Sequence, residues 1–119
     1  MKVMLFGATG MVGQGVLREC LLDPEISVVL AVGRSATGQR HEKLRDLVVP
    51  EVANLSAVER DLRGFDACLF CLGVSSAGMS EERYGKLTYD LTLGVARTLA
   101  RLNPGMTFIY VSGMSTDSS

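Results

Sequence analysis

Hydrophobic residues gather in short runs along the chain, and polar or glycine-rich breaks separate them. Five runs have the length and composition of buried strands: 2–6, 26–32, 47–49, 66–72 and 107–111. Between them, helices are predicted at 11–22, 55–62 and 80–102, and a polar loop at 35–40. The alternation of strands and helices predicts a parallel sheet covered on both faces.

The longest predicted helix has a clear apolar repeat. Its apolar positions recur every three or four residues, as one face of a helix requires: Tyr84, Leu87, Leu91, Val95, Leu99 and Leu102. Ser80 can cap its start. With the other elements, it predicts a doubly wound α/β fold of Rossmann type, with five strands in the order 3-2-1-4-5. We expect residues 1–119 to form a single domain.

Composition narrows the class of protein. Hydrophobic residues make up 47% and charged residues 21% of the chain, as in a globular domain. The net charge of −1 provides no long-range field for nucleic acid or an anionic membrane. The apolar runs are too short to cross a bilayer, and no signal peptide is evident, so we expect a cytoplasmic protein.

The cysteines are predicted to pack in the core and not to form a redox or zinc site. Cys68 and Cys71 match the C-x-x-C pattern of redox and zinc sites, but they lie in a strand-like run, where residues three apart point to opposite faces. There is no second pair, and His41 is the only histidine. We therefore predict core cysteines and no metal site.

A glycine motif follows the first predicted strand and opens the first predicted helix. Its residues are Gly7, Ala8, Thr9, Gly10, Met11, Val12 and Gly13. Here Gly7 permits a sharp turn, Gly10 admits a pyrophosphate to the backbone, and Gly13 lets the helix lie close to the sheet. Free amides at the helix start bind phosphate. The motif predicts nucleotide binding by Gly7, Thr9, Gly10, Met11, Val12 and Gly13; the alternative is a packing turn.

The Gly-Ala-Thr-Gly form of this motif resembles the short-chain dehydrogenases/reductases, in their extended and atypical branches. The resemblance continues at 32–34, 70–73, 89–90 and 111–113, and is greatest to members related to Tat-interacting protein. It implies an NAD(P)-dependent oxidoreductase or epimerase. It also implies that Leu72 and Gly73 line the nicotinamide side of the cofactor and that Ser112 is a catalytic residue, with Ser115 as the alternative.

The end of the second predicted strand indicates which cofactor is used. An NAD site usually places an acidic residue there to hold the ribose hydroxyls, whereas this chain has Arg34 followed by Ser35. A guanidinium can hold a 2′-phosphate bidentately, and Ser35 can add a hydroxyl donor. We therefore predict NADP as the cofactor; the alternative is a solvated arginine at a loop start.

The chain lacks the catalytic pair that the resemblance implies. That pair is a Tyr with a Lys four residues later, but the tyrosines here are followed at that distance by Thr88, Leu93 and Met114. We expect an amino-terminal part, truncated after the fifth strand and inactive alone, of a longer oxidoreductase. The alternative is a non-catalytic nucleotide sensor or protein-interaction module. We also expect a homo-oligomer, since an uncovered final strand offers its edge to another chain. The sequence does not indicate the substrate.

Overall fold

Five parallel strands form one sheet in the order β3-β2-β1-β4-β5. The computed structural model describes residues 1–71 and 80–111. The strands are β1 (Lys2–Phe6), β2 (Val28–Gly33), β3 (Leu44–Val48), β4 (Ala67–Phe70) and β5 (Thr107–Tyr110). This arrangement confirms the predicted doubly wound Rossmann-type sheet and its strand order.

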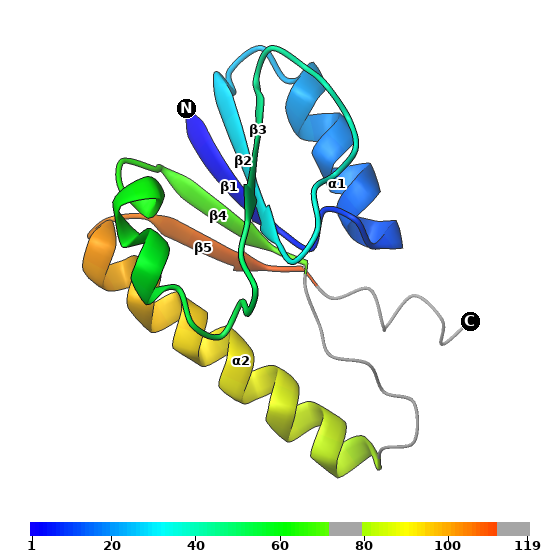
Figure 1. The fold of residues 1–119 in the computed structure, drawn as a ribbon, viewed down its shortest axis with the longest axis vertical. Coiled ribbons are helices and arrows are strands. Elements are labelled where there is room, and N and C mark those ends of the chain that lie inside the picture. The colour runs from blue at the N-terminus through cyan, green and yellow to red at the C-terminus, as the bar shows by residue number, and fades with distance from the viewer. Residues whose placement is uncertain (72–79, 112–119) are drawn as a thin grey trace.

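Helices cover the two faces of the sheet (Figure 1). Helix α1 (Met11–Leu22) packs on one face, whereas the 3₁₀ helix η1 (Ser56–Leu62) and the long helix α2 (Glu81–Leu102) lie on the other. The larger core lies on the α2 face and contains Met4, Phe6, Phe70, Val95 and Leu99. A smaller core lies under α1. Successive strand residues therefore serve different cores, as the period of a strand requires.

Several predicted boundaries need correction. The segment predicted as a short α-helix at 55–62 is the 3₁₀ helix η1, and β2 begins at Val28 rather than at residue 26. Strand β3 starts at Leu44, before the apolar run that predicted it. It is an edge strand with mostly exposed side chains, so its first residues carry no strong hydrophobic signal. Val48 was expected to pack in the core but is 53% exposed, whereas Val49 is buried.

Helix α2 matches its predicted length, and the Ser80 side chain accepts a hydrogen bond from the Arg83 amide at 3.2 Å, which confirms the predicted cap. The helix is best buried toward its end, where Val95, Leu99 and Leu102 lie in the core; in its first half Thr88 is buried, but Leu87 is 36% exposed. The start of the helix extends past the sheet (Figure 1), so no strand among the described residues lies beneath that part.

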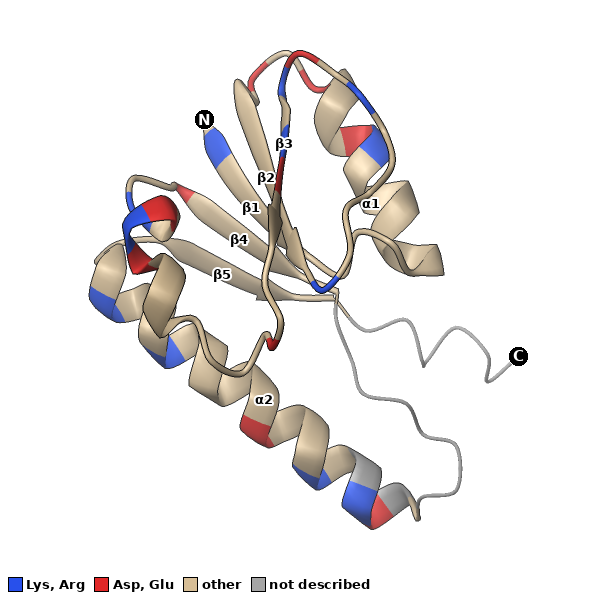
Figure 2. Ribbon diagram, viewed as in Figure 1, with Lys and Arg blue, Asp and Glu red and all other residues tan. Residues whose placement is uncertain are grey.

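The surface of the described residues has no strongly charged element, and one edge of the sheet is exposed. Basic and acidic residues are distributed over α1, η1 and α2 in Figure 2 rather than gathered on one element. Among the described residues, no helix is long and apolar enough to cross a membrane. Strand β5 lies at the sheet edge with Ile109 and Tyr110 nearly half exposed. Self-association through this edge stays a prediction.

Candidate nucleotide-binding site

The turn between β1 and α1, which we call the glycine loop (residues 7–13), is built from backbone constraints. Gly7 has a φ of +83°, in the left-handed region that favours glycine. The Gly10 amide donates to the Gly7 carbonyl at 3.2 Å and closes the turn. Gln14 then donates from its side chain to the Thr9 carbonyl at 2.8 Å, which holds the middle of the loop against the helix.

Gly13 brings the helix down onto the turn. It is buried, and a Cβ at this position would overlap the carbonyl group of Gly7. No side chain larger than a hydrogen atom fits there unless the helix moves away from the end of β1. The structure therefore explains the last glycine of the motif by close packing of α1 on the turn, the role that the sequence predicts.

Gly10 differs from its two companions. Its φ of −76° and ψ of 169° are open to any residue, and a Cβ would meet the Gly7 carbonyl oxygen at an ordinary 3.6 Å. Nothing within the described chain therefore requires glycine at this position. Gly10 is also the N-cap of α1 and makes no side-chain cap, so the first amides of the helix are not occupied by it. The backbone amides at the start of α1, which is the positive end of the helix dipole, are therefore not covered by a side chain of residue 10.

A pocket of about 520 Å³ opens beside the glycine loop, within the usual range for small-molecule sites. Gly7 and Thr9 line it from the loop, and Arg34 and Ser35 line it from the end of β2. The sequence predicted all four as cofactor-binding residues, and the fold brings them together. The side chains of Arg34 and Ser35 are exposed, so both are accessible to a ligand.

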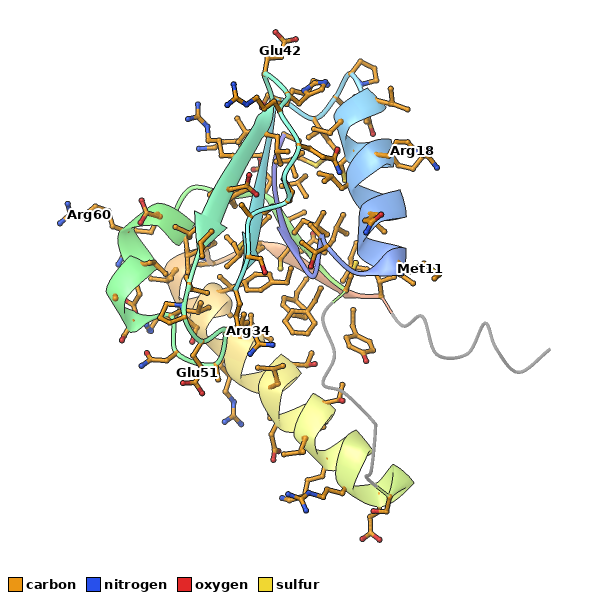
Figure 3. The ribbon with its side chains drawn as sticks, turned by 45° about the vertical axis from the view of Figure 1, so that its right-hand side comes forward. Met11, Arg18, Arg34, Glu42, Glu51 and Arg60 are labelled. Carbon is orange, nitrogen blue, oxygen red and sulfur yellow. The ribbon has the colours of Figure 1, made fainter. Side chains whose placement is uncertain are left out.

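Sequence analysis missed the third wall of the pocket. This wall is the segment after β3, residues 50–53, joined by Leu91 of α2 and by Thr37. The Val49 amide donates to the Gly33 carbonyl at 2.8 Å, which brings this segment beside Arg34. Figure 3 shows Arg34 and Glu51 near each other, beside α2. The topology alone could have indicated the wall, because parallel strands end at one edge of a sheet.

Not every predicted residue lies in this pocket. Gly10 and Gly13 belong to the glycine loop but do not line the cavity. Met11 and Val12 instead line a groove between α1 and the sheet that also includes Ile26 and Leu69, and Met11 is 91% exposed. Their backbone amides remain at the helix start. Leu72, Gly73 and Ser112 lie outside the described residues.

The three cysteines are free thiols; Cys20 and Cys68 are buried, and Cys71 is half-buried. Cys68 packs in the α2-side core and Cys71 against the α1-side core, on opposite faces as predicted. Burial, with a smaller effect of Cys71, raises the pKa of Cys68 to about 12. Burial also raises the pKa of Cys71 and of Cys20. Thiols in this state are poor nucleophiles and poor metal ligands. The part of the chain that the structure describes contains no cluster of metal-ligating side chains.

No family model and no curated protein matches this sequence. Solved structures match the fold. A mutant uronate dehydrogenase from Agrobacterium tumefaciens complexed with NAD superposes with a TM-score of 0.69 at 19% identity, over 93% of this chain and 40% of that one. A proposed epimerase from Bacteroides thetaiotaomicron gives 0.69 at 24% identity, over 92% of this chain and 45% of that one.

Yeast methylglyoxal/isovaleraldehyde reductase complexed with NADPH gives a TM-score of 0.65 at 19% identity, over 86% of this chain and 33% of that one. The chain thus shares the Rossmann-type fold of these structures, and it spans less than half the length of each of them.

Proposed function

We propose that this chain is the NADP(H)-binding domain of a short-chain dehydrogenase/reductase-like oxidoreductase or epimerase. The observation that carries the proposal is Gly10. It stands at the start of α1, where the described residues impose no conformational or packing need for glycine, and a ligand at the helix start gives a reason to keep the position free of a side chain. A pyrophosphate is the group that suits amides at a helix start.

The pocket suits the adenosine half of the same cofactor. Its apolar lining includes Val52, Ala53 and Leu91, against which an adenine ring can pack. Arg34 and Ser35 then lie where the ribose of a nucleotide extends from the glycine loop along the ends of the strands. The bound dinucleotide supplies or accepts a hydride; the residues named here bind and orient it.

Arg34 supports a preference for NADP over NAD. Among the lining residues Arg34 carries the positive charge and Glu51 the negative charge. Arg34 follows β2 directly, the position from which a side chain can reach the ribose 2′ oxygen. A guanidinium there forms charge-assisted hydrogen bonds with a 2′-phosphate. The carboxylate of Glu51 belongs to the third wall, and in this proposal it contacts the adenine amino group instead.

Titration of NADPH and NADH against the wild-type chain tests the proposal. We expect NADPH to bind about ten- to a hundredfold more tightly, the value of a charge-assisted phosphate contact. Arg34→Asp should abolish or reverse this preference. Arg60→Asp is a matched control, since Arg60 is an exposed arginine of η1 remote from the pocket (Figure 3). Equal affinities in the wild type would remove Arg34 from the argument.

A second function, nucleotide sensing without chemistry, is favoured by one observation. No tyrosine in these 119 residues is followed four positions later by lysine. General acid–base catalysis of that kind contributes about 10²–10⁴-fold to a rate. We therefore propose that this stretch binds the cofactor but transfers no hydride itself. Steady NADPH oxidation by the purified chain with a carbonyl substrate would contradict this.

A further inference from the structure

The connection between β2 and β3, residues 34–43, carries Arg34 and Ser35, and we call it the crossover. It contains no helix. A segment with so little regular structure needs other contacts to hold a defined shape. Those contacts decide whether its first residues stay in the pocket.

Asp46 of β3 makes such a contact with both carboxylate oxygens. The Thr37 amide donates to Oδ1 at 3.1 Å, and the Thr37 hydroxyl donates to Oδ2 at 3.2 Å. The Thr37 hydroxyl oxygen also accepts from the Gln39 amide at 3.3 Å. A single carboxylate thus fixes the backbone and side chain of Thr37, and through Thr37 the turn that follows.

The register of the sheet shows which face this contact occupies. Asp46 pairs with Ala31 of β2, and paired residues of neighbouring strands point to the same face. Ala31 belongs to the core under α1, so Asp46 lies on the α1 face of the sheet, and the crossover runs along that side of β3 (Figure 1). Asp46 does not line the pocket, whereas Thr37, Arg34 and Ser35 do.

We propose that Asp46 is a positioning residue: its carboxylate holds Thr37 and thereby keeps Arg34 and Ser35 in place for the 2′-phosphate. This inference rests on the proposed NADP(H) binding. It predicts that Asp46 controls the discrimination between NADPH and NADH, although its own negative charge would repel a phosphate. Positioning and charge therefore have opposite effects, and this opposition makes the proposal testable.

The first experiment compares dissociation constants of NADPH and NADH for the wild type, Asp46→Ala and Asp46→Asn. Loss of hydrogen bonds to an ionised group in Asp46→Ala should weaken NADPH binding about five- to tenfold and NADH binding less than about twofold. Asn can still accept from the Thr37 amide, so Asp46→Asn should retain most of the preference. If both variants instead bind NADPH more tightly, Asp46 acts by charge alone and the proposal fails.

Two further variants complete the test. Glu42→Ala removes an exposed acidic residue at the far end of the crossover (Figure 3), and should leave both affinities unchanged. Thr37→Val removes the hydroxyl but keeps the amide, so it should cause a smaller loss than Asp46→Ala. The two losses should also fail to add in the double variant, because they share one contact. Additive losses would overturn the proposal.

Limited trypsin digestion without cofactor separates this inference from the proposed function. Arg34 and Arg40 are exposed cleavage sites within the crossover. Asp46→Ala should be cut there several times faster than the wild type or Glu42→Ala. If the wild type shows no NADPH preference, the proposed function fails, and the cleavage rate alone then decides whether Asp46 holds the crossover. Unchanged cleavage with an unchanged affinity ratio overturns the inference.

Discussion

The glycine loop and the crossover form adjacent walls of one pocket, but different forces define their shapes. In the glycine loop the backbone itself is constrained: Gly7 needs a positive φ, and Gly13 has no room for a Cβ. The first part of the crossover is held mainly by side-chain contacts from Asp46 to Thr37, and its end by Lys43, which bonds to the end of α1 and pairs through its carbonyl with the Val29 amide. The shape of the glycine loop is therefore fixed by steric constraint, whereas the shape of the crossover depends on a few hydrogen bonds.

The largest effect that would sharpen this comparison comes from Gly13→Ala. The added Cβ would overlap the Gly7 carbonyl, so α1 must move off the sheet, and we expect a loss of about 3 kcal/mol or more in the free energy of unfolding. Urea denaturation followed by circular dichroism would measure it.

Gly15→Ala is the matched control, the same substitution two residues along the same helix. A Cβ at Gly15 meets nothing within 4 Å. Alanine there should raise the free energy of unfolding by about 0.5–1 kcal/mol, since it is the better helix former. If Gly13→Ala and Gly15→Ala have the same free energy of unfolding, steric constraint does not hold the glycine loop. The proposed difference between the glycine loop and the crossover would then be wrong.

The difference between the two walls explains what the sequence could predict. Where the backbone requires glycine, the sequence shows glycine at a fixed distance after a strand, so the glycine loop could be predicted. The strand order could be predicted from the alternation of strands and helices. The contact from Asp46 to Thr37 spans nine positions in an exposed, polar segment. Such residues are equally common in loops that bind nothing, so no pattern distinguishes them.

The third wall was missed for another reason. Pro50 and Glu51 follow an edge strand whose first residues are largely exposed, and neither belongs to a motif. Their place in the pocket follows from pairing of β3 with β2 and from the bond between Val49 and Gly33. These contacts join residues far apart in the sequence, so no local pattern indicates them. The predicted 55–62 helix illustrates the same limit, because local pattern does not separate an α-helix from a 3₁₀ helix of this length.

Gly10→Val should have the next largest effect, on affinity rather than stability. The backbone at Gly10 accepts any residue, so the free energy of unfolding should fall by only about 1 kcal/mol, the cost of a poor N-cap. A branched side chain at position 10 would displace a pyrophosphate from the amides at the start of α1. NADPH affinity should therefore fall about a hundredfold. Isothermal titration calorimetry would measure it.

Gly10→Ala, with a smaller side chain, should weaken binding less than Gly10→Val. If Gly10→Val binds NADPH normally, the glycine loop is only a turn. In that case Gly10, the glycine of this loop that neither backbone conformation nor packing explains, would lose its proposed reason.

The smallest expected effect concerns the other end of the crossover. Lys43 donates from Nζ to the carbonyls of Leu21 and Asp23, at 3.2 and 2.9 Å, and so caps the end of α1. Lys43→Met keeps most of the aliphatic stem but removes the charged donor. We expect a loss of about 1 kcal/mol in the free energy of unfolding, with NADPH affinity within about twofold of wild type. Together with Asp46→Ala, this variant would divide the crossover into a part that positions Arg34 and a part that stabilises α1. A loss of NADPH affinity as large as that of Asp46→Ala would instead show that the whole crossover moves as one unit, and Asp46 would then hold no special place in it.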